Sequence, residues 1–263
     1  MRHAQIAYEK QQKEIKDLQE FIAKNKARVA TTDLAKSRQR RLDKMEILEK
    51  PSERPKPNFK FKESKASGKF VVTCRDLVIG YDTPLSKPLN LVIERGHKIA
   101  IKGANGIGKS TLLKTMLGIQ KPISGKAELD YNLEYGYFVQ EEKYDRTTAL
   151  EEVWNMYPGM TNPEVRGALA SCGLTKDHIE SLMVVLSGGE AAKVRLCKLM
   201  LKECNFLVLD EPTNHLDVDA KESLKQALKN FKGTILLVSH EPEFYEDVVD
   251  TIWNAEEWTT KIV

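Results

Sequence analysis

The chain has 263 residues, 41% hydrophobic and 30% charged, which is enough for one well-cored domain with appendages or for two small domains. No stretch approaches the roughly 18 consecutive apolar residues of a membrane-spanning helix, and the N-terminus lacks the apolar core of a signal peptide, so we expect a cytoplasmic protein without membrane insertion. Residues 1–66 hold 18 Lys/Arg and 10 Asp/Glu, a net charge of +8, whereas the remainder holds 23 and 28, a net charge of −5, so the basic arm indicates a polyanionic partner.

Two amphipathic helices joined by a polar break are predicted in residues 1–50. The apolar side chains of residues 6–29 recur at helical steps and share one face: Tyr8, Ile15, Leu18 and Ile22. The TTD break at residues 31–33 offers N-caps for a second helix. That helix presents one stripe made of Leu34, Ser37, Arg41, Met45 and Leu48. We expect the two helices to fold into an antiparallel hairpin, followed by a proline-rich polar connector over residues 51–69.

A compact domain is expected over residues 70–263, and it begins with β-structure. FVVTCRDLVIGY (residues 70–81) and LNLVIERGHKIAIKG (residues 89–103) alternate apolar and polar positions, which predicts strands of a partly exposed sheet. The four cysteines are scattered without a CxxC pair, which indicates small buried hydrophobic side chains in a reducing compartment. They are Cys74, Cys172, Cys197 and Cys204.

Two later runs are apolar at every position, which is typical of parallel strands covered on both faces: residues 206–209 and 235–238. The apolar residues between them recur every fourth position and predict a helix: Leu216, Ala220, Leu224 and Leu228. The two runs and the helix form a predicted βαβ unit, so the fold class is α/β. Residues 148–200 are predicted to be mainly helical.

The stretch GANGIGKST (residues 103–111) matches the phosphate-binding pattern GxxxxGK[ST]. It lies between a predicted strand and a predicted apolar helix, which is the context that this pattern requires. The glycines of the loop let backbone N–H groups wrap a phosphate: Gly103, Gly106 and Gly108. Lys109 is expected to reach the β- and γ-phosphates, and the Ser110 hydroxyl is expected to ligate Mg²⁺.

Two adjacent carboxylates end the first apolar strand, where ligands of open α/β sheets bind. Asp210 is placed to hold Mg²⁺ through water, and Glu211 is a candidate base that orients an attacking water. His240 ends the next strand and suits a γ-phosphate contact, but a histidine at a strand end, taken alone, is more often structural. Gln140, after the run YGYFV, and Tyr81, which either stacks an adenine or packs as an ordinary tyrosine, are weaker candidates.

LSGGEAAK (residues 186–193) is a glycine turn that opens a helix, the local geometry that binds an anion. Together with GANGIGKST, Gln140, LVLDEPTNHLD and Ser239-His240, in this order and spacing, it resembles the ATPase domain of the ATP-binding cassette (ABC) family over about residues 70–255. EPTNHLD with LSGGE resembles the ABC-F subfamily: soluble tandem-cassette ATPases, many of which bind ribosomes and some of which protect them from antibiotics. SRQRRLDKME before the prolines resembles the end of the linker between the two cassettes, whereas Ala191 departs from the common glutamine.

The resemblance implies a P-loop NTPase fold of ABC type, with a mixed sheet core, an antiparallel β subdomain and a helical signature subdomain, preceded by the helical hairpin. ATP and Mg²⁺ are the implied cofactors. The residues implied on the nucleotide are Tyr81, Gly103, Asn105, Gly106, Gly108, Lys109, Ser110 and Thr111. The implied catalytic residues are Glu211, His240 and Gln140, and the implied Mg²⁺ residues are Ser110, Gln140 and Asp210. Ser187, Gly188 and Gly189 would close over ATP held by the opposite cassette, with Asp217 at the interface between the cassettes.

Three functional hypotheses follow. The sequence begins within the linker-like segment, so we expect the C-terminal half of a two-cassette protein whose partner is a second cassette or a second copy. The leading hypothesis is ATP-driven closure on the ribosome, with RNA phosphates contacted by Arg38, Arg40, Arg41 and Lys44. A charged spacer is the alternative for this arm. The other two hypotheses are a nucleotide-binding subunit of a membrane transporter and a nucleotide-binding fragment that hydrolyses ATP weakly.

Overall fold

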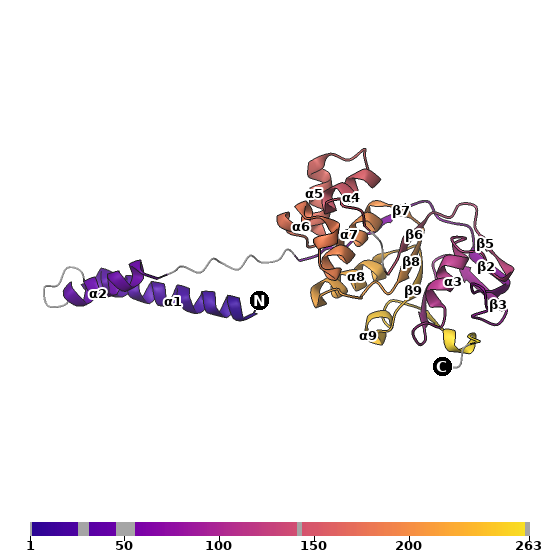
Figure 1. The fold of residues 1–263 in the computed structure, drawn as a ribbon, viewed down its shortest axis with the longest axis horizontal. Helices are drawn as coiled ribbons and strands as arrows, with labels where there is room; N and C mark the ends of the chain where they lie inside the picture. Colours follow the sequence, from indigo (N-terminus) through magenta and orange to yellow (C-terminus); the bar gives the residue numbers. More distant parts are fainter. Residues whose placement is uncertain (1, 26–31, 46–55, 141–143, 261–263) are drawn as a thin grey trace. The chain divides into compact units, whose positions relative to one another are not determined.

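The computed structural model describes residues 2–25, 32–45, 56–140 and 144–260, which fall into two compact units, Met1–Glu53 and Arg54–Val263 (Figure 1). The described helices of the first unit are α1 (Arg2–Asn25) and α2 (Thr32–Asp43). Their predicted antiparallel pairing is confirmed by two contacts: Arg41 forms an ion pair with Glu14, and the Arg38 guanidinium lies 3.5 Å from the ring centre of Phe21.

The apolar stripes of the hairpin are borne out only in part. Leu18 and Ile22 are buried on α1, as their spacing predicts. Leu34 is 58% exposed, so the predicted stripe on α2 does not begin there. The predictions for the side chains of Tyr8 and Leu48 lie outside the described part of the chain.

The described part of the second unit contains two large sheets and a two-stranded one, formed by β1 (Lys62–Glu63) and β7 (Glu203–Cys204), which is described below. A five-stranded parallel sheet has the order β10-β4-β9-β8-β6, with strands β4 (Lys98–Lys102), β6 (Tyr135–Phe138), β8 (Phe206–Asp210), β9 (Thr234–Val238) and β10 (Thr251–Asn254). A three-stranded antiparallel sheet has the order β3-β2-β5, with strands β2 (Phe70–Val78), β3 (Leu89–Glu94) and β5 (Ser124–Leu129). The α/β class is confirmed, and the parallel and antiparallel strands occupy separate sheets.

Helices cover the parallel sheet and extend one end of the unit. They are α3 (Lys109–Met116), α4 (Ala149–Met156), α5 (Asn162–Ser171), α6 (Lys176–Glu180), α7 (Gly188–Leu201), α8 (Val218–Asn230) and α9 (Pro242–Tyr245). Figure 1 shows α4, α5 and α6 together at one end of this unit and β2, β3 and β5 at the other, with the parallel sheet between them. The mainly helical character predicted for residues 148–200 is confirmed.

The predicted βαβ unit is present as β8, α8 and β9. Both strands are buried along their whole length and pair in parallel register. Ala220, Leu224 and Leu228 form the buried face of α8, while Leu216 is buried just ahead of that helix. Continuous apolar runs and a four-residue repeat were therefore sufficient to predict this part of the fold.

The prediction of a partly exposed strand at residues 98–102 is wrong. β4 lies between β10 and β9, and Ile99, Ala100 and Ile101 are all buried. Ala100 packs into one hydrophobic cluster, whereas Ile99 and Ile101 pack into the other, so both faces of β4 are covered. The polar ends of this strand, Lys98 and Lys102, made a central strand resemble an alternating one.

The end of the predicted polar connector belongs to the second unit, which begins at Arg54 and is described from residue 56. Phe59 and Phe61 are buried in the core, and Phe61 meets the ring of Phe231 edge to face with centroids 6.2 Å apart. Strand β1 (Lys62–Glu63) pairs in parallel with β7 (Glu203–Cys204). The two phenylalanines at alternate positions thus anchor this segment in the core, while Lys60 and Lys62 remain exposed to solvent. Residues 51–55 of the predicted connector are not among the residues that the structure describes.

Candidate functional site

The glycine-rich loop connects β4 to α3 and brings its polar groups to the carboxyl end of the parallel sheet. Gly108 is the N-cap of α3 and has φ of 108°, a left-handed conformation that favours glycine. Lys109 opens the helix, is only 6% exposed, and donates from Nζ to the carbonyl oxygens of Gly103 and Ala104 at 2.8 Å each. The loop therefore places a buried ammonium group beside a helix N-terminus, which favours an anion.

The charge of Lys109 is set by competing neighbours. Burial lowers its pKa, while the charges of Glu211, Asp210 and Glu256 act in the opposite direction. A bound polyphosphate would add negative charge on the same side as these carboxylates. The site therefore combines a desolvated cation with acidic groups that keep it charged.

Asp210 ends β8 as a buried carboxylate. Its side chain is 2% exposed, and its Oδ1 has no hydrogen-bond partner among the described residues. Burial raises its pKa, against which the hydrogen bond from Ser110 acts. A buried oxygen without a partner is costly, and carboxylate and hydroxyl oxygens are the donors that Mg²⁺ takes. The pair Asp210 and Ser110 therefore fits a divalent cation.

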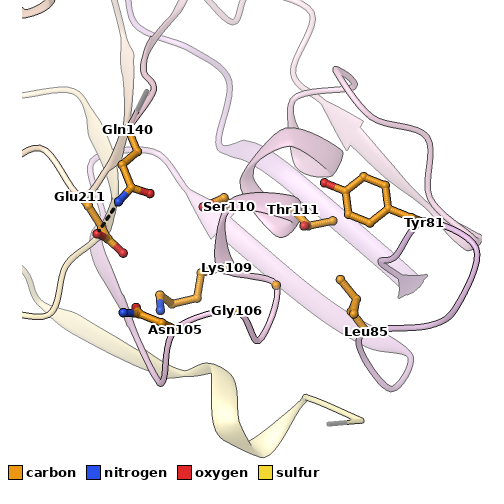
Figure 2. Close-up of a pocket in the computed structure, with 10 residues that line it drawn as sticks. Tyr81, Leu85, Asn105, Gly106, Lys109, Ser110, Thr111, Gln140 and Glu211 are labelled. Atoms are coloured by element: carbon orange, nitrogen blue, oxygen red, sulfur yellow. Dashed lines mark hydrogen bonds between the residues drawn. The ribbon is translucent and has the colours of Figure 1, made fainter. Parts of the chain in front are cut away.

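Glu211 is held by three side chains at the same sheet edge. Its backbone has φ of 50°, and its amide donates to Val238 O at 3.0 Å, which fixes the turn after β8. Its Oε2 accepts from Gln140 Nε2 at 3.0 Å (Figure 2). The same oxygen accepts from Asn214 Nδ2 at 2.6 Å. The carboxylate is 14% exposed and approaches His240 from the other oxygen.

His240 lies between the phosphate loop and the carboxylate. Its Nε2 is 3.1 Å from Lys109 Nζ and 3.2 Å from Glu211 Oε1. In the neutral ring, Nε2 either accepts from the ammonium group or donates to the carboxylate, but it cannot do both. The protonation of this one nitrogen therefore decides whether His240 binds Lys109 or Glu211.

A cavity of about 370 Å³ joins most of the predicted nucleotide residues. Its lining residues are Tyr81, Leu85, Asn105, Gly106, Gly108, Lys109, Ser110, Thr111, Gln140 and Glu211. Figure 2 shows Tyr81 and Leu85 at one end and Gln140 and Glu211 at the other. Tyr81 is 66% exposed, so it presents a ring face rather than packing in the core. An apolar end and a phosphate-binding end are the two surfaces that a nucleotide needs.

The remaining predicted residues lie elsewhere on the chain. Ser187 caps α7, where it forms a reciprocal capping box with Glu190. A Cβ at Gly189 would lie 2.5 Å from the carbonyl oxygen of His215, and one at Gly188 would lie 3.0 Å from its ring. Asp217 caps α8 and forms an ion pair with Lys193 of α7 at 2.7 Å. The glycine turn at 187–189 and the turn after Glu211 are therefore packed against each other, outside the cavity lining.

Three residues of the site were missed at the sequence level. Asn214 holds Glu211, Leu85 lines the cavity, and Arg195 Nη1 donates to the carbonyl oxygen of Gln140 at 2.8 Å. Asn214 lies three residues after Glu211 in a tight turn, which is a usable signal. Leu85 and Arg195 come from distant segments and have no local signal.

Comparison with known families identifies proteins that are similar to this chain. A family model described as "ABC transporter" matches residues 86–214, and a second model with the same description matches residues 1–61. The chain is 58% identical over 260 residues to the uncharacterized ABC transporter ATP-binding protein YfmM of Bacillus subtilis, covering 98% of this chain and 50% of that protein. It is 39% identical over 254 residues to ABC transporter F family member 2 of Arabidopsis thaliana, covering 94% and 37%. The chain thus spans half or less of the length of these relatives.

Solved structures share the fold. A putative ABC transporter ATP-binding protein from Pyrococcus furiosus superimposes with a TM-score of 0.60 and 25% identity, covering 72% of this chain and 99% of that one. A dimeric ATP-binding cassette bound to ADP and Pi superimposes with a TM-score of 0.60 and 21% identity, covering 70% and 93%, which supports the fold alone. With this fold, the family match and the phosphate loop together, the chain contains the ATP-binding domain of the ABC transporter family, a P-loop ATPase cassette.

Proposed function

We propose that the chain is an ABC-F-type cassette that binds ATP with Mg²⁺, hydrolyses it, and closes against a second cassette while its basic arm contacts the ribosome. The proposal of ATP hydrolysis rests on the carboxylate of Glu211. Its contacts with Gln140, Asn214 and His240 hold it beside the phosphate loop. The support for the subfamily is the similarity to ABC transporter F family member 2 and the helical arm ahead of the cassette.

In this proposal each end of the cavity has one task. Tyr81 stacks on the adenine, while Asn105, Gly106, Gly108 and Thr111 line the phosphates with Lys109. Gly103, whose carbonyl oxygen accepts from Lys109, completes the loop. Ser110, Asp210 and Gln140 hold Mg²⁺, which supplies charge neutralisation on the phosphate oxygens when bound. Glu211 accepts a hydrogen bond from the attacking water and orients it, and His240 contacts the γ-phosphate.

The chain provides only part of a closed site under this proposal. Ser187, Gly188 and Gly189 lie at the N-terminus of α7 and offer a hydroxyl and helix N–H groups without a lysine of the phosphate loop. We assign them to the ATP of a second cassette, with Asp217 near the interface. Hydrolysis is therefore expected to be slow for dilute protein and to rise per chain with protein concentration. A rate per chain that stays high and constant at sub-micromolar protein would contradict this.

Replacing Glu211 by glutamine tests the hydrolytic assignment. Glu211→Gln keeps the shape of the side chain and removes its basicity, so turnover is expected to fall about 100-fold or more while ATP binding persists. Glu241→Gln is a matched control, because Glu241 lies just beyond the same sheet edge and pairs with Lys221 at 2.7 Å. Steady-state phosphate release and equilibrium nucleotide binding are the measurements. Turnover of Glu211→Gln at the parent rate would overturn the role of Glu211 as base.

The basic arm supports a nucleic-acid partner. Two of its predicted RNA-contacting cations are engaged within the hairpin, since Arg41 pairs with Glu14 and Arg38 covers the ring of Phe21. Arg40 and Lys44 are exposed on the described part of α2 and its end. These two cations are therefore the ones we assign to RNA phosphates, where binding weakens steeply with salt.

Co-sedimentation with ribosomes tests the arm. Glu211→Gln with ATP is expected to co-sediment at low salt, and the bound fraction is expected to fall as salt rises. Arg40→Ala with Lys44→Ala should reduce the bound fraction and the salt dependence, whereas Lys126→Ala, which removes an exposed cation of β5, should not. Equal sedimentation of all three proteins would contradict an RNA contact by the arm. Co-purification with a permease in the membrane fraction would favour a transporter subunit instead.

A further inference from the structure

Three sulfur atoms meet inside the helical part of the cassette, far from the nucleotide residues in sequence. Cys197 and Met200 lie one turn apart on α7, so their side chains leave the same face of the helix. Cys172 is the C-cap of α5, which packs against that face. The sequence spacing of these cysteines does not predict a cluster, because α5 and α7 are brought together only by tertiary packing.

Cys172 contacts both of the other sulfur-bearing side chains. The Cys172 thiol lies 3.6 Å from Met200 Sδ and is also hydrogen-bonded to the Cys197 thiol. A metal–sulfur bond of about 2.3 Å places neighbouring sulfurs roughly 3.8 to 4.0 Å apart in tetrahedral or trigonal geometry. The observed separation therefore needs only a small outward shift to admit a metal ion. Both cysteines are fully buried, and Met200 is partly buried.

The cluster has an approach from a second cavity. This cavity has a volume of about 620 Å³ and is distinct from the nucleotide cavity. Cys197 and Met200 line it together with Ser171, Phe61 and Lys60. Two ligands thus face a space that a small cation can enter, and the third lies directly behind them.

We propose that Cys172, Cys197 and Met200 form a binding site for one soft monovalent metal ion, Cu(I). Thiolate and thioether sulfurs select Cu(I) over hard cations such as Mg²⁺ and Ca²⁺. Among the described residues, no three His, Cys, Asp or Glu side chains gather to hold a metal, and the site differs from such clusters because its third ligand is a methionine. The site is independent of the proposed nucleotide chemistry.

Binding of the metal ion exchanges two protons for the ion. A metal-bound cysteine is a thiolate, so each of the two thiols loses its proton when the ion binds. Two S–H bonds break, two protons leave, and two metal–thiolate bonds and one metal–thioether bond form. No electron is transferred. The complex of one Cu(I) ion with two thiolates and one thioether carries one negative charge.

Competition with a Cu(I) chelator tests the site in the full chain. The reduced protein, kept anaerobic with a phosphine reductant, is titrated with Cu(I) against a bathocuproine-type chelator, and Ag(I) serves as a redox-inert cross-check. One equivalent per chain is expected to resist the chelator and to raise the thermal unfolding temperature. Failure to compete, or no rise in the unfolding temperature, would overturn the proposal.

Matched variants separate the cluster from cysteine content alone. Cys172→Ala and Cys197→Ala should lose the bound equivalent, whereas Cys204→Ala, which removes a fully buried thiol outside the cluster, should retain it. Met200→Leu conserves volume and is expected to weaken binding by about tenfold or more without changing the fold. Loss of the metal in Cys204→Ala, or unchanged affinity in Met200→Leu, would refute the assigned ligand set.

Discussion

Asp210 and Glu211 are adjacent in the chain but differ in their surroundings. Asp210 closes a fully buried strand and keeps one oxygen without a partner among the described residues, whereas Glu211 turns away through a left-handed backbone and meets three polar side chains. Burial raises the pKa of Asp210, which means that its ionised form is disfavoured in the folded protein. The ionised carboxylate of Asp210, which suits a cation, therefore destabilises the folded protein when no cation is bound.

Replacing Asp210 by asparagine should therefore stabilise the fold at neutral pH. A raised pKa contributes stability below the unfolded pKa of about 3.9, and that contribution is lost as pH rises through the folded value. Asp210→Asn removes the charge, so its melting temperature should exceed that of the parent at pH 7 and approach it as pH falls toward 4. Thermal unfolding across this pH range is the measurement. A lower melting temperature at pH 7 would contradict the prediction.

Asp247 provides a control of opposite sign. Its pKa is lowered by the hydrogen bond and charge of Lys225, then by Lys229. A lowered pKa contributes stability above the unfolded value and loses it as pH falls through the folded value. Asp247→Asn should therefore lower the melting temperature slightly at pH 7 and have no effect at acidic pH. The side chain is 63% exposed, so the effect should be smaller than at Asp210.

At the scale of elements, α7 begins at the glycine turn of residues 187–189 and packs against the turn that follows Glu211. Ser187 and Glu190 cap its N-terminus, and Lys193 pairs with Asp217 from the turn that follows Glu211. Gly189 packs so closely on His215 that a side chain has no room. A shift of α7 would therefore move the turn that follows Glu211, the proposed base. This contact couples the residues assigned to one ATP with those assigned to another.

Gly189→Ala should break this contact. The added Cβ would meet the carbonyl oxygen of His215 at 2.5 Å, and backbone cannot give way cheaply, so a loss of about 1–3 kcal/mol in unfolding free energy is expected. Gly167→Ala on α5 is the matched control, because nothing lies within 4 Å of its Cβ position. That change should stabilise by about 0.5–1 kcal/mol through helix propensity. Urea unfolding measures both, and equal stabilisation by the two alanines would contradict the packing argument.

The elements that the sequence predicted share one property, a pattern that is local. The phosphate loop and the unit of β8, α8 and β9 are specified by spacing within a short segment. Strand β5 has an exposed pattern without apolar alternation and exists because it pairs with β2. β4 was misjudged because its burial comes from neighbouring strands. Pairing partners and cover are long-range properties that no local pattern encodes.

The candidate site divides along the same line. The lining residues of the cavity that we assign to the nucleotide are candidates from the sequence, except for Leu85, because the loop and the strand ends that build it carry their own motifs. Asn214 lies in the motif LVLDEPTNHLD, so its place beside Glu211 is predictable from the sequence. Arg195 and Leu85 could not, because they reach the site from segments brought there by tertiary packing. The sulfur cluster is the extreme case, with ligands on two helices and no motif.

At the scale of the whole molecule, the boundary between the two units lies between Glu53 and Arg54. The cassette does not begin at its first long strand, because Phe59 and Phe61 fill its core and β1 extends along β7. Asn58 N donates to Ser171 O at 2.7 Å, and Phe59 N donates to Ser223 Oγ at 3.0 Å, so the segment binds α5 and α8 at once. Residues 58–63 are therefore part of the folded cassette rather than a linker.

Two truncations test this boundary. Removing residues 1–53 deletes only the first unit, so the urea midpoint of the cassette should stay within experimental error of the parent. Removing residues 1–63 also deletes both phenylalanines and β1, and the cassette should lose at least about 3 kcal/mol, the typical cost of truncating one buried phenylalanine. Phe61→Ala in the full chain should account for much of that loss, because its ring packs on Phe231. If the shorter and longer truncations unfolded at the same urea concentration, residues 58–63 would be a linker after all.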